Sequence, residues 1–173
     1  MNTASVAGPL STLLSEIVDG TPPTGGYMLN RNDVGLFASL ERLSAAEASE
    51  VIDGGSSIAA HVDHITYYAS LINRWAAGES PYADADWKVS WTRTTVTQEA
   101  WATRRLELER EFRRWRDVIK EPRDVTESEL TGIIAGIAHL AYHLGAIRQM
   151  DRKIRGPSAN NEQDAFISPA SPT

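Results

Sequence analysis

The sequence of 173 residues contains no cysteine, so thiolate nucleophiles, cysteine-ligated zinc, iron–sulfur clusters and disulfides are all excluded. It also lacks a surplus of basic residues. The formal net charge of -6 argues against broad contact with the phosphate backbone of a nucleic acid. No apolar run approaches the roughly 20 residues needed to span a bilayer, and no signal peptide is recognisable at the N-terminus. We therefore expect a cytoplasmic protein that binds neither nucleic acid nor a membrane.

Several catalytic motifs are absent as well. The sequence has no HExxH, which excludes a zincin, and no ExxH, which argues against a di-iron bundle. It has no GxxxxGK[ST] or GxGxxG phosphate loop. No carboxylate is arranged to complete a serine triad. The chemistry of this chain must therefore come from other residue types.

Apolar residues recur at three- and four-residue spacing in four segments, which are expected to be helices. These cover about residues 10–18, 57–77, 98–120 and 127–155, with a smaller helix near 33–43. Ser56 or Ser57 can cap the second of the four, and Thr126 with Glu129 fits a capping box before the last. The segment from Glu79 to Thr95 reads as a long connection held by its aromatic rings.

The expected fold is all-α, with a single domain over residues 1–155. The helix at 98–120 mixes arginines with glutamates, which is typical of a solvated face. From residue 156 to 173 the chain is rich in Pro, Ser, Asn and Ala, so we expect a flexible C-terminal tail.

The four histidines fall in two places, and this clustering is the most informative feature of the sequence. His139 and His143 stand one turn apart on one helix face, within reach of a single ion. Gly132 and Gly136 lie on the same side. A glycine inside a helix costs about 1 kcal/mol relative to alanine. Two glycines on this face therefore indicate that its residues leave space around the imidazoles at the expense of helix stability.

His61 is the natural third ligand because it falls within the apolar arc of its helix, whereas His64 lies roughly 60° to one side. Three neutral imidazoles with one open position are typical of a catalytic site for zinc or another divalent ion. The alternative is that these histidines are core residues hydrogen-bonded to carbonyl groups, which is the commoner role of a histidine on an apolar face.

Two segments contain all four histidines: Ser57-Ile58-Ala59-Ala60-His61-Val62-Asp63-His64 and Ile137-Ala138-His139-Leu140-Ala141-Tyr142-His143-Leu144-Gly145-Ala146-Ile147-Arg148-Gln149. They resemble the corresponding segments of the DinB/YfiT-like metalloenzymes. The resemblance covers roughly Leu10 to Asp151, and further matches lie at Asp86-Trp87, at Trp91 and in the segment from Leu71 to Glu79.

This resemblance implies a DinB-like four-helix bundle in the order up-down-down-up, with a short extra helix after the first. It also implies a divalent ion, nickel or zinc, held by His61, His139 and His143. His64 has no fixed counterpart among the family's ligands and would lie beside them. Many members form homodimers, so a homodimer is expected here.

Members with an assigned activity include bacillithiol-dependent transferases and a mycothiol-dependent maleylpyruvate isomerase. The resemblance therefore implies a metal-dependent enzyme that activates a low-molecular-weight thiol or water for attack on a small electrophile, as a thiol S-transferase or a hydrolase. Tyr68 and Arg148 are the candidates for contact with the substrate. A second hypothesis is a non-catalytic, dimeric bundle that binds metal or serves a stress response.

Overall fold

The computed structural model describes residues 1–154, which form helices and 3₁₀ turns and no β-strand longer than an isolated bridge. The expected tail at 156–173 lies outside the described residues. Four long helices make the body: α1 (Ala4–Asp19), α4 (Ile58–Ala76), α5 (Gln98–Lys120) and α6 (Glu127–Met150). The short elements are α2 (Leu36–Glu41), α3 (Ala45–Ser49) and two 3₁₀ turns, η1 (Pro81–Asp84) and η2 (Val89–Trp91).

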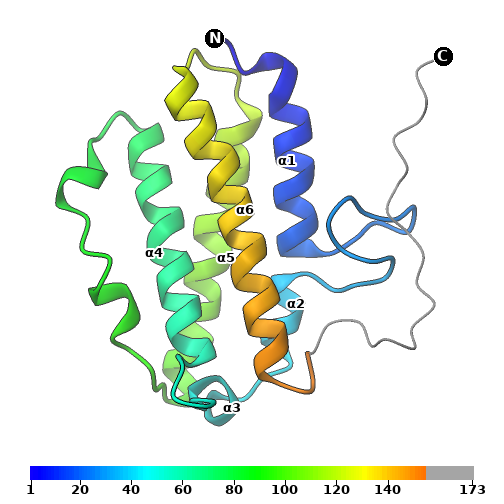
Figure 1. The fold of residues 1–173 in the computed structure, drawn as a ribbon, viewed down its shortest axis with the longest axis vertical. Coiled ribbons are helices and arrows are strands. Elements are labelled where there is room, and N and C mark those ends of the chain that lie inside the picture. Colours follow the sequence, from blue (N-terminus) through cyan, green and yellow to red (C-terminus); the bar gives the residue numbers. More distant parts are fainter. Residues whose placement is uncertain (155–173) are drawn as a thin grey trace.

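The four long helices follow the expected up-down-down-up order. Helices α4 and α5 run in one direction and α1 and α6 in the other (Figure 1). Helix α4 packs against both α5 and α6, and α1 packs against the same two helices. Because α4 and α5 are parallel, the chain between them has to return along the length of the bundle. It does so along the outer side of α4, where η1 and η2 pack on that helix (Figure 1).

The helix starts that carry the site are set by side-chain caps. The Ser57 hydroxyl accepts a hydrogen bond from the Ala60 N–H at 3.2 Å, so α4 starts where the sequence predicts. The capping box at the start of α6 is also present. The Glu129 N–H donates to the Thr126 hydroxyl at 3.2 Å, and the Thr126 N–H donates to the Glu129 carboxylate at 2.7 Å.

Three regions differ from the sequence-based expectation. Helix α6 ends at Met150 and not near residue 155, because the backbone is already extended at Asp151. Helix α1 starts at Ala4 and not near residue 10, because the N-terminus is fastened to the α5–α6 connection. The Met1 amino group donates to the Val125 carbonyl at 2.6 Å. The expected helix near 33–43 is shorter and is followed by α3, which begins with a capping box formed by Ser44 and Glu47.

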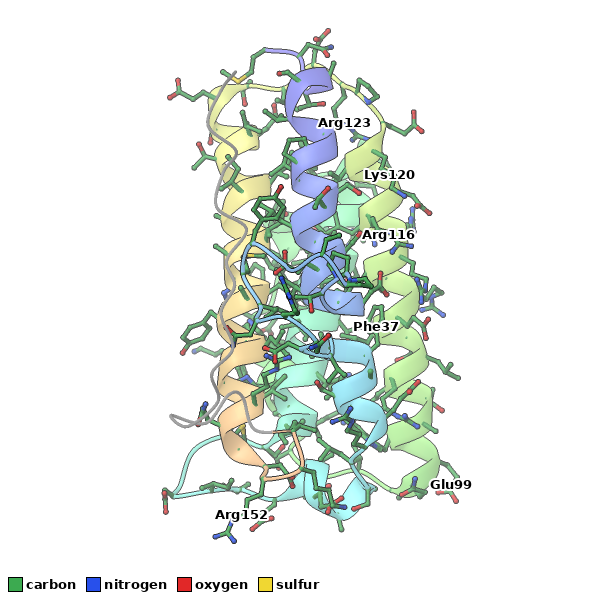
Figure 2. The ribbon with its side chains drawn as sticks, turned by 90° about the vertical axis from the view of Figure 1, so that its right-hand side faces the viewer. Phe37, Glu99, Arg116, Lys120, Arg123 and Arg152 are labelled. Atoms are coloured by element: carbon green, nitrogen blue, oxygen red, sulfur yellow. The ribbon has the colours of Figure 1, made fainter. Side chains whose placement is uncertain are left out.

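Large rings and branched side chains fill the core between the four helices. Trp101, Phe112 and Trp115 of α5 are fully buried. The opposite face of α5 is charged and solvated, as predicted: Arg113 pairs with Glu109 at 2.6 Å, and Arg116 with Asp19 at 2.8 Å (Figure 2). Of the described helices, α6 alone has the length and composition to cross a membrane. This corrects the expectation that no apolar run is long enough, although the core helix of a soluble protein can have the same length and composition.

The segment after α1 is organised by a buried carboxylate. Glu16 is 3% exposed and accepts hydrogen bonds from the backbone N–H groups of Tyr27, Met28 and Leu29 at 2.8, 2.7 and 2.6 Å. Three donors satisfy the charge of this carboxylate without a basic partner. This loop is thus a fixed part of the structure.

The connection between α4 and α5 is attached to α4 by polar contacts as well as by rings. Arg93 forms an ion pair with the buried Asp63 of α4 at 2.8 Å, and the Ser57 hydroxyl donates to the Thr94 carbonyl at 2.6 Å. The backbone N–H of Asp86 donates to the Tyr67 hydroxyl at 3.0 Å. These contacts place η2 over the first half of α4.

Candidate metal centre

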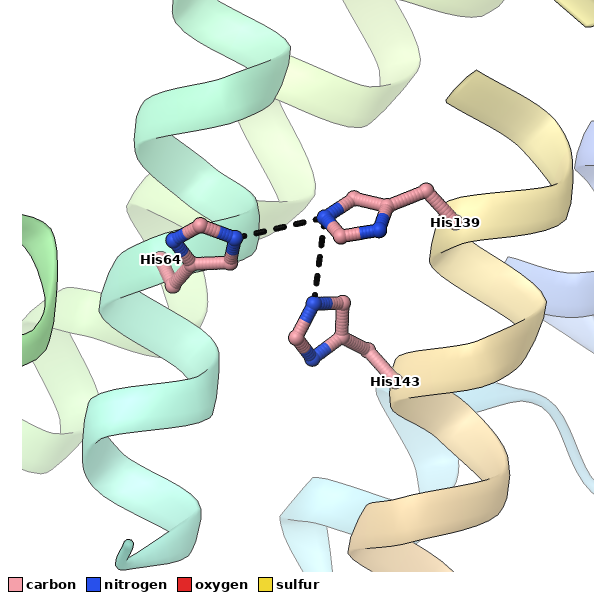
Figure 3. Close-up of side chains that lie close together, drawn as sticks. All are labelled: His64, His139 and His143. Carbon is pink, nitrogen blue, oxygen red and sulfur yellow. Dashed lines mark hydrogen bonds between the residues drawn. The ribbon is translucent and has the colours of Figure 1, made fainter. Parts of the chain in front are cut away.

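Three histidine side chains converge between α4 and α6. The Nε2 atom of His139 lies 3.2 Å from Nε2 of His64 and 3.1 Å from Nε2 of His143 (Figure 3). One ligand atom from each ring lies within 4.8 Å of the other two. His64 projects from α4, and His139 and His143 project from successive turns of α6 (Figure 3). The HxxxH pair therefore meets a third histidine from another helix.

The environment of His64 determines which of its ring nitrogens faces the cluster with a lone pair. Its Nδ1 lies 2.9 Å from the Ser90 hydroxyl, and that hydroxyl donates its one hydrogen to the Trp87 carbonyl at 2.7 Å. Nδ1 of His64 must therefore be the donor to Ser90. A neutral imidazole has a single N–H, so its Nε2 presents a lone pair to His139.

His61 lies beside the cluster and contacts the other edge of His143. The two Nδ1 atoms are 2.8 Å apart. When His143 is the donor in this bond, its Nε2 carries a lone pair and faces His139. His61 then accepts the hydrogen on Nδ1 of His143, as Ser90 accepts the hydrogen on Nδ1 of His64. In both rings Nδ1 is the nitrogen remote from the cluster. Such partners orient metal-binding histidines in many proteins.

Burial keeps these rings neutral at physiological pH. Burial, together with the smaller effect of the neighbouring histidines, lowers the pKa of His143 to about 3 and that of His64 to about 4. Burial also lowers the pKa values of His61 and His139. The rings can therefore offer lone pairs and not positive charge.

The donor set fits a divalent cation. A single hydrogen on His139 Nε2 cannot satisfy two neighbouring lone pairs well, whereas a cation would satisfy all three nitrogens. Two nitrogens that bind one tetrahedral zinc ion at 2.0–2.1 Å stand about 3.3 Å apart. The two short separations in the cluster, 3.1 and 3.2 Å, are close to that value.

Aromatic rings form the wall of the centre on the side of the α4–α5 connection. Trp91 stacks on His64 with ring centroids 4.3 Å apart and meets His61 edge-on at 5.1 Å. The ring of Tyr68 lies 5.2 Å from that of His139. Burial raises the pKa of Tyr68 to about 12, so its hydroxyl stays protonated and can donate a hydrogen bond.

The structure brings most of the expected residues together. His61, His139, His143, His64 and Tyr68 all lie at this centre, although the convergent nitrogens come from His64, His139 and His143, with His61 one contact away. Helix α6 places Arg148 elsewhere. Its guanidinium pairs with Asp33 at 3.0 Å and donates to the Val34 carbonyl, so it holds the segment before α2.

Sequence reasoning missed the part played by Ser90. No motif marks it, because its position over His64 depends on the return path of the connection. Trp87 and Trp91 were expected to anchor that connection, and both do so beside the histidines: Trp87 lies 6.1 Å from the His64 ring. The one sign of this return path in the sequence was that the connection between α4 and α5 is long.

Comparison with known proteins supports the resemblance drawn from the sequence. The model of the DinB superfamily matches residues 29–147, which include all four histidines and more than half of the chain. No curated protein and no solved structure gives a significant match.

Proposed function

Since the chain belongs to the DinB superfamily, we propose that it is a metal-dependent enzyme in which His64, His139 and His143 bind one divalent ion, nickel or zinc. The reaction is the attack of a low-molecular-weight thiol or water on a small electrophile, as in a thiol S-transferase or a hydrolase. The observation that carries this proposal is the convergence of three imidazole nitrogens from two helices.

A divalent ion held by imidazoles supplies Lewis acidity, which favours the ionised form of a bound water or thiol. The protein's own groups prepare the site. Ser90 and His61 fix the orientations of His64 and His143 through their Nδ1 atoms. Trp91 shields His64 from water by stacking on it. Tyr68, beside His139, keeps its proton and can donate a hydrogen bond to a polar substituent of the substrate.

The resemblance stated above favours His61 as the third ligand, and the geometry favours His64. In the structure the Nδ1 atom of His61 faces Nδ1 of His143, away from the Nε2 atoms that converge. His64 in contrast has its Nε2 3.2 Å from that of His139. We therefore assign His64 to the ion and His61 to the support of His143.

The test is the metal content of untagged protein, measured by mass spectrometry. Wild type should hold about one equivalent of a single divalent metal, and His64→Ala, His139→Ala and His143→Ala should hold none. Thr131→Ala is the matched control, because Thr131 lies on α6, is exposed, and donates its hydroxyl hydrogen to the Glu127 carbonyl of the same helix. Circular dichroism confirms that each variant keeps its helices. A wild type without metal, or variants with full metal, would refute the proposal.

A melting experiment with chelator separates an enzyme from a structural metal protein. Metal that holds the fold together contributes its binding energy to stability, so its removal lowers the melting temperature greatly. In an enzyme the four buried helix faces hold the fold, and we expect a small decrease. A large decrease would favour the non-catalytic bundle. A small one, followed by turnover of an electrophile with a small thiol, supports the enzyme.

We also propose that the protein is a cytoplasmic homodimer that pairs through α6. Ile134 and Tyr142 project from this helix and are 51% and 69% exposed. Contiguous exposed apolar surface is typical of protein–protein interaction sites.

A further inference from the structure

A pocket of about 370 Å³ opens next to the histidine cluster. It lies between α4, the α4–α5 connection and the first half of α6. Four of its lining residues are aromatic: Tyr68, Trp75, Tyr82 and Trp87. A volume of this size matches the lower end of small-molecule sites in proteins, which are mostly apolar with a few polar groups.

Two of these rings join the pocket to the candidate metal centre. Tyr68 lines the pocket, and its ring lies 5.2 Å from that of His139. Trp87 also lines the pocket, and its ring lies 6.1 Å from that of His64. A molecule held in the pocket would therefore have one end beside the histidines.

The charge of the pocket disfavours anions. The described residues along it include one carboxylate, Glu129, and no basic side chain. The backbone and hydroxyl groups of Thr126 donate to this carboxylate and lower its pKa, so it stays negative. Burial raises the pKa of Tyr82, so its hydroxyl remains neutral. A divalent ion at the histidines would lie beside one end of the pocket only, so an anionic group held elsewhere along this lining would lack a paired cation, which is costly.

We propose that this pocket binds the substrate, and that the substrate is an uncharged molecule with an aromatic ring. Offset and edge-to-face stacking on four rings would provide the affinity. The Tyr68 hydroxyl would donate a hydrogen bond to a polar substituent of this molecule, next to the histidines. That the bound molecule is a substrate rests on the proposed function, but its binding in the pocket does not require a metal.

Gly132 gives a means to fill the pocket without disturbing the fold. It lines the pocket, and a Cβ added there would meet no atom within 4 Å. Leucine is also a better helix former than glycine. Gly145, 13 residues further along α6, has equally open surroundings. It lies about 20 Å away along the helix axis, so Gly145→Leu is the matched control.

The experiment is calorimetric titration of the purified protein with 1-naphthol and with 1-naphthoate, which share a ring system and differ in charge. We expect 1-naphthol to bind, and 1-naphthoate to bind at least about tenfold more weakly. Gly132→Leu should weaken 1-naphthol at least about tenfold, and Gly145→Leu should leave it unchanged. Should Gly132→Leu fail to fold, Trp87→Ala removes a stacking ring and must weaken binding as well.

Metal content is measured on the same samples, which separates the two proposals. If Gly132→Leu blocks 1-naphthol while no sample contains metal, the pocket is real and the proposed function fails. If 1-naphthoate binds as tightly as 1-naphthol once chelator has removed any divalent ion, which would itself attract the carboxylate, the charge argument is overturned. If Gly132→Leu binds 1-naphthol like wild type, the pocket is not the binding site.

Discussion

The Nδ1 atom of His61 lies 2.8 Å from the Nδ1 atom of His143, while the Nε2 atom of His143 lies 3.1 Å from His139. One edge of the His143 ring thus contacts a supporting histidine and the other faces the candidate ligands. The pattern is that of a metal-binding histidine whose second nitrogen is fixed by a hydrogen bond.

The first prediction separates the roles of His61 and His64. His61→Ala should keep a saturable metal site with an affinity reduced about 10- to 100-fold, because it removes an orienting partner and no ligand. His64→Ala should leave no stoichiometric site. Competition with a chromogenic chelator measures both affinities.

The conservative variant His61→Asn is the control, because its amide oxygen can accept the hydrogen of His143. It should recover part of the lost affinity. If His61→Ala abolishes binding and His64→Ala retains it, the ligands are instead His61, His139 and His143.

The second prediction concerns the pH dependence of stability in metal-free protein. The folded-state pKa values of His64 and His143, about 4 and about 3, lie below the ordinary value of 6.5. The unfolded chain therefore takes up protons that the folded chain does not, and stability decreases as the pH falls through 6.5. Urea denaturation at pH 7.5 and pH 5.5, with chelator present, should show a lower free energy of unfolding at the lower pH.

This pH interval lies above the ordinary range of carboxyl groups, so the decrease reports the histidines. His143→Asn, whose side chain does not titrate, should show a smaller decrease than wild type. Equal free energies of unfolding at the two pH values in wild type would contradict the burial of neutral imidazoles.

The third prediction concerns Gly136. A Cβ at this position would lie 2.6 Å from the Tyr68 hydroxyl and 3.2 Å from the buried Trp115 ring. Gly136→Ala should gain about 1 kcal/mol in helix propensity. It should lose more through overpacking, which typically costs about 1–3 kcal/mol. We expect a net loss of stability, measured by urea denaturation.

Gly132→Ala provides the comparison, since its added methyl group meets nothing within 4 Å and should stabilise the protein. Combining Gly136→Ala with Tyr68→Phe should restore part of the loss, because the closest atom is removed. If Gly136→Ala is as stable as Gly132→Ala, the Tyr68 hydroxyl does not occupy this space.

Much of the fold could be read from local signals. The caps at Ser57 and Thr126 and the three- and four-residue spacing located α4, α5 and α6. The start of α1 could not be read in this way, because it depends on bonds between Met1 and Val125, far apart in the sequence. The capping box of Ser44 and Glu47 begins α3 just beyond the expected helix near 33–43, and no helix was expected there.

The residues of the site were predicted better than their individual roles. The spacing of the histidines indicated that the two pairs meet at one site. A helical wheel gives the direction of a Cβ atom and not the rotation of the ring beyond it, so His61 and His64 were hard to rank. The burial of Glu16 was also invisible, because its three partners are backbone groups of a loop that no residue pattern positions.

The parallel arrangement of α4 and α5 has an evolutionary consequence. The candidate ligands lie on α4 and α6, whereas Trp87, Ser90 and Trp91 belong to the connection that returns between the parallel helices. Substitutions at Tyr82 and Trp87, the residues of this connection that line the pocket, can reshape its wall without replacing a metal-binding side chain. Related proteins could therefore diversify their substrates through residues 77–97 while the two histidine-bearing helices stay the same.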